Sequence, residues 1–156
     1  MSIVYIGIGS NLGERRENCI NAIKLLQDRG VKVIKQSSMI ETEPWGVKDQ
    51  PHFINMAIEA ETSLSPQKLL RCMKDIELSM GRVESVHWGP RVIDLDILFY
   101  DDRIIDSADL QIPHPHLHER DFVLISLREI APEKVHPTLK TKICELKTQV
   151  QRQFAK

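Results

Sequence analysis

The chain has 156 residues, of which 42% are hydrophobic, and its 21 Lys and Arg residues nearly balance 22 Asp and Glu residues. This length and composition predict one domain that spans residues 1–156 and has a substantial core. The formal net charge of -1 argues against the strong basic field of proteins that bind nucleic acids or anionic membranes, so neither partner is expected.

The cysteine pattern favours a reducing, cytoplasmic location. Cys19, Cys72 and Cys144 are odd in number, far apart and form no Cys-x-x-Cys pair. Reduced thiols are therefore expected rather than a disulfide framework or a zinc site. The sequence shows no signal peptide, and no apolar run approaches the roughly 20 residues that cross a bilayer. We expect a monomer with no membrane partner.

The first part of the chain predicts a strand, a turn and a helix. Residues 3–9 form an apolar run typical of a buried strand, and residues 9–13, Gly-Ser-Asn-Leu-Gly, predict a tight turn. A helix is expected over about residues 14–29, and one of its faces carries Cys19, Ile23 and Leu26. Residues 31–41 predict a second strand.

A loop, a strand and a second helix follow. Residues 42–52 are rich in turn-forming residues and predict a long loop, after which residues 53–61 predict a third strand. Ser65 and Pro66 form a strong helix start, and Gly81 marks its end. The expected buried stripe of this helix consists of Leu69, Met73, Ile76 and Met80.

Two carboxylates interrupt an apolar strand within residues 88–100. Asp94 and Asp96 are predicted to project from one face, while the other face fills a core with Ile93, Leu95, Ile97 and Phe99. Paired carboxylates attract a hard cation such as Mg²⁺, which proteins hold with one or two carboxylates together with substrate phosphates. Arg91 adds donors suited to phosphate oxygens. A solvated strand end is the alternative explanation.

The order strand-helix-strand-strand-helix-strand predicts an α+β fold with a ferredoxin-like βαββαβ core. A C-terminal extension of short strands and helices is expected to follow, with a strand near 103–106, an irregular segment over 110–116, a helix near 119–130 and a helix from about 141. The sheet face that the first two helices leave open is the predicted ligand face. Asn55, Arg91, Asp94 and Asp96 are expected there.

Five motifs resemble one family, the 6-hydroxymethyl-7,8-dihydropterin pyrophosphokinases (HPPK) of folate biosynthesis. They occur in order along nearly the whole chain, at Gly9 to Gly13, Asp49 to Asn55, Glu77 to Arg82, Trp88 to Ile97 and Pro113 to Phe122. The resemblance implies an ATP- and Mg²⁺-dependent diphosphokinase. Such an enzyme transfers the β,γ-pyrophosphoryl unit of ATP to the hydroxymethyl group of the reduced pterin and releases AMP, with two Mg²⁺ ions bound. ATP and this pterin are the implied small-molecule partners.

The resemblance also implies roles for individual residues. Asp94 and Asp96 would hold the two metal ions and, together with Arg82 and Arg91, form the catalytic set. The implied ATP-binding residues are Glu77, Arg82, Trp88, Arg91, Ile97, His114 and Arg120. The implied pterin-binding residues are Gly9, Thr42, Pro44, Trp45, Phe53, Asn55, Trp88 and Phe122, with the two phenylalanines as aromatic walls. The loops 42–52 and 81–91 are expected to close over the substrates.

Several of these residues have structural alternatives. Phe53 and Phe122 could be core residues, and Glu77 could form an ion pair or pack within the fold. Arg82 and Arg120 could be solvated surface residues. The run of His114, His116 and His118 could bind zinc, although no fourth ligand is nearby. The sequence departs from the family pattern at Glu84, where many members carry an arginine. A glutamate at this position would repel phosphate rather than attract it.

Two other functions remain open from the sequence. A ferredoxin-like sheet can serve as a non-catalytic ligand-binding or RNA-binding module, although this chain lacks a basic, aromatic surface. A nucleotidyltransferase also uses two carboxylates and two metal ions. The nucleotide product distinguishes these classes from a pyrophosphokinase.

Overall fold

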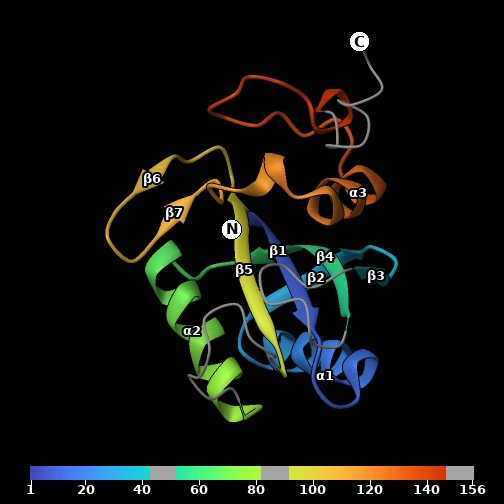
Figure 1. The fold of residues 1–156 in the computed structure, drawn as a ribbon. Coiled ribbons are helices and arrows are strands. Elements are labelled where there is room, and N and C mark those ends of the chain that lie inside the picture. The colour runs from blue at the N-terminus through green and yellow to red at the C-terminus, as the bar shows by residue number, and fades with distance from the viewer. Residues whose placement is uncertain (43–51, 82–91, 147–156) are drawn as a thin grey trace.

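The computed structural model describes residues 1–42, 52–81 and 92–146, and a five-stranded antiparallel sheet runs through its centre (Figure 1). The strand order is β2-β4-β1-β5, and β3 also pairs with β4. The strands are β1 (Ser2–Ser10), β2 (Val31–Gln36), β3 (Ile40–Thr42), β4 (Phe53–Thr62) and β5 (Asp94–Tyr100). The helices are α1 (Arg15–Asp28), α2 (Pro66–Ser79) and α3 (Asp121–Ile130). A small hairpin of β6 (Ile105–Asp106) and β7 (Gln111–Ile112) and the 3-10 turns η1 (Leu117–Glu119) and η2 (Ile143–Glu145) complete the fold.

This arrangement confirms the predicted α+β fold with a βαββαβ core. α2 begins where the sequence predicted, because the Ser65 hydroxyl accepts a hydrogen bond from the Lys68 amide and Pro66 occupies the first turn. The helix ends before Gly81, whose φ of 94° lies in the left-handed region that glycine adopts most easily. None of the helices in the described ranges is long and apolar enough to span a membrane.

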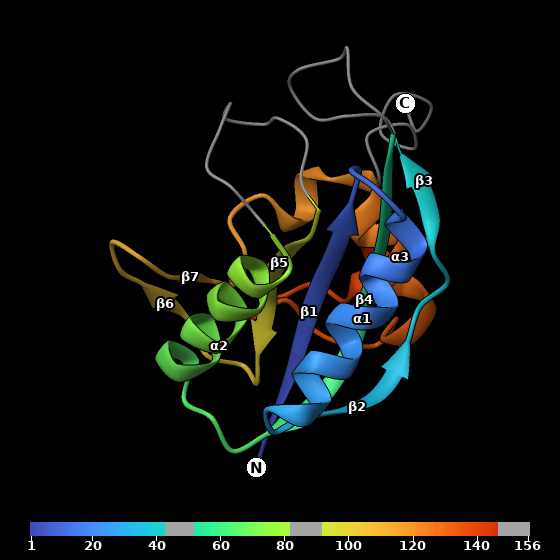
Figure 2. The same cartoon turned by 90° about the horizontal axis from the view of Figure 1, so that it is seen from below.

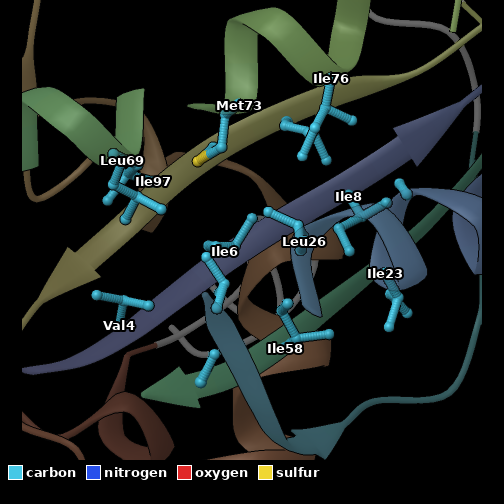
Figure 3. Packing of buried hydrophobic residues seen from close by; sticks show 14 of the residues in the cluster. Val4, Ile6, Ile8, Ile23, Leu26, Ile58, Leu69, Met73, Ile76 and Ile97 are labelled. Atoms are coloured by element: carbon cyan, nitrogen blue, oxygen red, sulfur yellow. The ribbon is translucent and has the colours of Figure 1, made fainter. Parts of the chain in front are cut away.

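The main core lies between the sheet and the two helices α1 and α2, which cover the same face (Figure 2). Figure 3 shows Ile6 and Ile8 of β1 beneath Leu26 of α1, while Met73 and Ile76 of α2 meet the sheet beside β5. All five side chains are at most 1% exposed. Burial of each such side chain contributes roughly 1.5–3 kcal/mol to folding, so this layer anchors the strands that carry the candidate site.

The opposite face of the sheet is only partly open, which corrects the sequence-based expectation. α3 and the segment that ends at η2 pack on one half of it, against Tyr5, Ala57 and Leu98 (Figure 1). Phe99 also lies in this second cluster, so its predicted place beside Ile97 was wrong. The cause is a register shift between β1 and β5, where Leu98 is an extra residue and the inside-outside alternation of β5 changes.

The predicted strand over residues 31–41 is two strands, because the regular backbone pairing with β4 is interrupted at Ser37 and Ser38, although the Ser37 amide still donates to the Ala57 carbonyl at 2.9 Å. The Ser37 hydroxyl accepts a hydrogen bond from the Ala57 amide at 2.8 Å, in place of a backbone carbonyl. The Ser38 amide and hydroxyl both donate to the Glu129 carboxylate of α3, at 2.8 and 2.7 Å. These side-chain hydrogen bonds end β2 and start β3.

The predicted helix from about residue 141 is wrong over the described residues. Instead, residues 134–143 form a loop closed by two backbone hydrogen bonds. The His136 amide donates to the Thr141 carbonyl at 2.9 Å, and the Ile143 amide donates to the Lys134 carbonyl at 2.8 Å. The His136 ring is buried, and its Nδ1 accepts hydrogen bonds from the Thr138 and Leu139 amides at 3.2 and 3.1 Å. The segment folds around this imidazole.

We predict that His136 makes the fold less stable in acid. Burial, followed by the neighbouring His118 and Lys134, lowers the pKa of His136, and protonation would abolish its acceptor at Nδ1. The unfolded chain takes up this proton near pH 6.5, at about the ordinary histidine pKa, while the folded chain does so only at lower pH. The free energy of unfolding should therefore fall as the pH drops below about 6.5.

Urea unfolding at about pH 7.5 and pH 5 measures this effect. His136→Asn keeps an acceptor near the position of Nδ1 but does not titrate, so the difference in unfolding free energy between the two pH values should be smaller than in the wild type. His116→Asn, at an exposed position, is the matched control. An unchanged pH dependence in His136→Asn would contradict the role given to His136.

Candidate active site

The candidate site lies at the C-terminal end of β1, between the N-terminal ends of β4 and β5. Gly9 pairs with Asn55 of β4 on one side and with Asp94 of β5 on the other, and Gly7 pairs with Asp96. Residues paired across a sheet point to the same face. Asn55, Asp94 and Asp96 therefore share one face, as predicted, next to the part that α3 covers, because the pairing of Asp96 with Gly7 continues to Ala57 of the second cluster.

Three predicted pterin-binding residues adjoin Gly9. A Cβ atom at Gly9 would lie 2.7 Å from Asn55 Oδ1 and 3.5 Å from Phe53 Cδ1, so only glycine leaves these side chains where they are. Asn55 is 8% exposed, and its Nδ2 donates to Thr42 Oγ1 at 2.6 Å. Thr42 in turn pairs with Phe53. Gly9, Thr42, Phe53 and Asn55 thus form one contiguous group.

Gly7 lies on the same face of β1, and the sequence analysis gave it no role. It lies beside Asp96 on the same face as Gly9, and a Cβ atom there would meet the Leu98 side chain at an ordinary distance of 3.5 Å. The two glycines alternate with the core residues Ile6 and Ile8, so β1 contributes no side chain of its own to this face at positions 7 and 9. Glycine at alternate positions of an apolar strand was the available signal for this.

Glu77 performs a structural function that was one of its two predicted alternatives. Its side chain is 6% exposed, and its Oε2 accepts a hydrogen bond at 2.9 Å from the amide of Leu95. Leu95 lies between the two aspartates, on a strand that forms the edge of the sheet. The carboxylate thus binds α2 to β5 at the point where Asp94 and Asp96 project. Its contact with ATP stays a prediction.

His114 lies against β5, because its amide donates to the Leu98 carbonyl at 3.1 Å. Its Nδ1 accepts a hydrogen bond from the His116 amide at 3.1 Å, so the proton of the neutral ring belongs on Nε2. Nε2 lies 3.8 Å from Asp96 Oδ1. The imidazole N–H therefore lies near the Asp96 carboxylate, and the contact of His114 with ATP stays a prediction.

The electrostatic setting keeps His114 neutral. Burial lowers its pKa to about 4, with further contributions from the positive charge of Arg120 and from His116. Asp96 acts in the opposite direction because its negative charge favours the imidazolium. At neutral pH His114 is therefore a hydrogen-bond donor through Nε2, and Arg120, at the junction of η1 and α3, supplies the positive charge nearby.

Two further residues lie at the edges of this arrangement. Phe122 is in the first turn of α3, where it is half-buried and packs against the second core cluster. Part of its side chain therefore has the core role that was the alternative to pterin stacking. Ile97 is 5% exposed and points to the α1 and α2 side (Figure 3). A nucleotide at β5 would meet the backbone of Ile97 rather than its side chain. Both assignments stay predictions.

Five residues with predicted roles lie outside the described part of the chain, as does Glu84: Pro44, Trp45, Arg82, Trp88 and Arg91. The structure neither supports nor contradicts the functions predicted for them.

The donor set suits Mg²⁺ better than zinc. Among the residues that the structure describes, no three His, Cys, Asp or Glu side chains gather in a way that could hold a metal ion, and this includes His114, His116 and His118. Two carboxylates are nevertheless enough for Mg²⁺, which completes its octahedral shell with phosphate oxygens and water. Asp94 and Asp96 provide such oxygen donors on a strand held by Glu77.

The fold and the site together define a ferredoxin-like α+β protein with paired carboxylates at the edge of its sheet, a class suited to phosphoryl transfer. The sequence profile of the family described as 7,8-dihydro-6-hydroxymethylpterin-pyrophosphokinase (HPPK) matches residues 5–132. The chain therefore belongs to the HPPK family, a family of pyrophosphokinases, as the five motifs predicted.

Curated relatives agree with this assignment. A 2-amino-4-hydroxy-6-hydroxymethyldihydropteridine pyrophosphokinase of Aquifex aeolicus is 42% identical over 147 residues, which are 94% of this chain and 91% of the relative. The protein of the same name in Bacillus subtilis is 46% identical over 133 residues, or 85% of this chain and 80% of the relative.

The chain also resembles parts of longer proteins. It covers 21% of the folic acid synthesis protein of Dictyostelium discoideum, which is 46% identical over 138 residues, or 88% of this chain. The crystal structure of Plasmodium falciparum HPPK-DHPS superposes with a TM-score of 0.73 at 17% identity, covering 93% of this chain and 44% of that one. This last similarity concerns the fold alone.

We predict that Gly9→Ala disrupts the pterin side of the site without unfolding the protein. The added Cβ would displace the Asn55 amide and break its hydrogen bond to Thr42. Loss of one such bond, about 1–1.4 kcal/mol, corresponds to a roughly five- to tenfold weaker binding of a reduced pterin. Calorimetric titration with the pterin and with ATP measures the change.

Gly7→Ala is the matched control, since it adds the same methyl group two residues away on the same strand face with no close contact. It should change pterin affinity much less than Gly9→Ala does. Equal effects of the two substitutions would show that Gly9 is needed only as part of the strand.

Proposed function

We propose that the chain transfers the β,γ-pyrophosphoryl unit of ATP to the hydroxymethyl group of 6-hydroxymethyl-7,8-dihydropterin, in a Mg²⁺-dependent reaction that releases AMP. The observation that carries the proposal is the row Asn55, Gly9 and Asp94 across three paired strands. It places a carboxylate pair suited to metal and phosphate directly beside residues suited to a planar ring. Donor and acceptor substrates would then meet over Gly9.

The phosphate half of the site would rest on Asp94, Asp96, His114 and Arg120. The two carboxylates would hold Mg²⁺, which when bound with ATP offsets the charge of the triphosphate and polarises the transferred phosphorus. His114 would donate from Nε2 to a phosphate oxygen, since its Nδ1 is occupied by the His116 amide. Arg120 would add positive charge on the same side. Arg82 and Arg91 are proposed to clamp the same oxygens.

The pterin half would rest on Phe53, Asn55 and Thr42, with Phe122 as the second wall. Phe53 is half-buried at the start of β4, and a flat heteroaromatic ring can stack on its exposed surface. Asn55 and Thr42 offer polar atoms for the edge of the ring, and their mutual hydrogen bond orients the amide before a substrate arrives. This pre-organisation lowers the entropic cost of binding.

In the proposed reaction the hydroxymethyl oxygen of the pterin attacks the β-phosphorus of ATP. A bond forms between that oxygen and the β-phosphorus, the bond from the β-phosphorus to the oxygen that bridges it to the α-phosphorus breaks, and AMP leaves with the bridging oxygen. The hydroxyl proton is released. The role of the protein in this chemistry is to hold the two substrates in line.

We also propose that the chain acts as a single pyrophosphokinase domain, as a monomer in the cytoplasm.

The nucleotide product tests the proposal. Incubation of the protein with ATP, Mg²⁺ and 6-hydroxymethyl-7,8-dihydropterin should yield AMP that depends on the pterin, without free pyrophosphate, when nucleotides are separated by chromatography. A kinase that attacks the γ-phosphorus would produce ADP, and a nucleotidyltransferase would produce pyrophosphate. Either product, or untouched ATP with a folded sample, would refute the proposed reaction.

We predict that Asp96→Asn abolishes most of the activity while the protein stays folded. The substitution keeps the shape of the side chain but removes a charged metal ligand, so the turnover rate should fall by roughly 10²- to 10³-fold. The melting temperature should change little, because Asp96 is 36% exposed. Asp109→Asn, which removes an exposed carboxylate between β6 and β7, is the control. Near-normal turnover of Asp96→Asn at saturating Mg²⁺ would exclude Asp96 as a metal ligand.

A further inference from the structure

Arg15 connects the elements that carry the pterin residues. It is the first residue of α1, and its Nη1 donates to Glu41 Oε1 at 3.0 Å and to the His52 carbonyl at 2.7 Å. Glu41 lies in β3 next to Thr42, and His52 directly precedes Phe53 in β4. One guanidinium nitrogen thus holds both strands at the point where Thr42 pairs with Phe53.

β3 is a short strand at the edge of the sheet. It is three residues long, and in the described part of the chain it pairs with β4 alone. A short edge strand that carries a ligand-binding side chain needs an additional anchor to hold its register. Arg15 supplies a charge-assisted hydrogen bond to each strand of the pair, and such bonds are stronger than those between neutral groups.

Arg15 is itself fixed relative to Gly9. The turn between β1 and α1 is held by Asn18, whose Nδ2 donates to the Leu12 carbonyl at 2.9 Å and to Ser10 Oγ at 3.2 Å. A continuous series of contacts therefore runs from the end of β1 to the start of α1 and, through the Arg15 guanidinium, to β3 and β4. β4 then returns to Gly9 through the pairing with Asn55.

We propose that Arg15 is a positioning residue of the pterin site, which sets the distance between Thr42 and the pair Phe53 and Asn55. This inference rests on the function proposed above. Arg15 would not touch the substrate but would act through the two strands. Its side chain is 31% exposed and that of Glu41 is 52% exposed, so the ion pair contributes little to global stability. Its effect should appear in substrate binding instead.

The test compares Arg15→Ala with Arg16→Ala, which removes the same charge from the adjacent, exposed position. Nη1 of Arg16 approaches Met39 Sδ, in the residue before β3, at 3.8 Å, which is a weak contact. Removal of Arg16 therefore leaves both hydrogen bonds of Arg15 in place. Arg15→Ala should raise the KM for the pterin roughly tenfold, as small misplacements of binding groups do, and the KM for ATP less than about twofold. Arg16→Ala should change neither.

Two further variants separate positioning from general destabilisation. Arg15→Lys retains a flexible donor and should recover part of the pterin KM. Glu41→Ala leaves the His52 contact in place and should give a smaller rise in the pterin KM than Arg15→Ala. A parallel loss for both substrates, an effect that follows the melting temperature across the variants, or no difference from Arg16→Ala would overturn the proposal.

Amide hydrogen exchange tests the same inference without catalysis. In Arg15→Ala the amides of residues 40–42 and 53–55 should exchange at least about fivefold faster than in Arg16→Ala, while those of α2 remain unchanged. If the wild type fails to form AMP but these amides respond, the proposed function is wrong and the positioning of β3 stands. If the wild type forms AMP and neither exchange nor pterin KM responds to Arg15→Ala, the positioning role is wrong.

Discussion

The hydrogen bond from the Leu95 amide to the buried carboxylate of Glu77 is the interaction on which the candidate site depends most. Among the described residues β5 is an edge strand of the sheet, with β1 as its only strand neighbour there. Edge strands without support can slip or fray. Glu77 satisfies the amide between Asp94 and Asp96 and joins it to α2, which is fixed in turn by Met73 and Ile76 in the main core. This hydrogen bond thereby fixes the strand segment with the two carboxylates to a helix that is anchored in the apolar core.

One register shift divides β5 into two parts with different surroundings. Before Leu98, the residues of β5 alternate between the core and the opposite face, and this alternation places both aspartates beside Gly7 and Gly9 of β1. After Leu98 the alternation reverses, and Phe99 enters the cluster under α3. The bulge thus divides one strand into a half that presents ligand groups and a half that closes a second core.

His114 shows how the environment can change the chemistry of a familiar residue. Its burial and the nearby Arg120 favour the neutral ring, while the His116 amide occupies Nδ1. A neutral donor beside paired carboxylates does not compete with a metal ion as a cation would, since it adds no repulsion. Positive charge at the site would instead come from arginines, which keep it at any physiological pH.

The sequence by itself determined the order of the elements, the fold class and the family, because periodic apolar runs, the Ser65 and Pro66 helix start and the five motifs are local patterns. It also placed Asp94 and Asp96 on one face, since strand alternation holds over three residues. Only the tertiary structure decided that α3 covers half of the ligand face, that Phe99 leaves the main core, and that Ser37 divides the second strand. It also showed Glu77 bound to the Leu95 amide and Arg15 bound to two strands. Each of these depends on contacts between residues far apart in the chain, and no local pattern encodes which partner a side chain will meet.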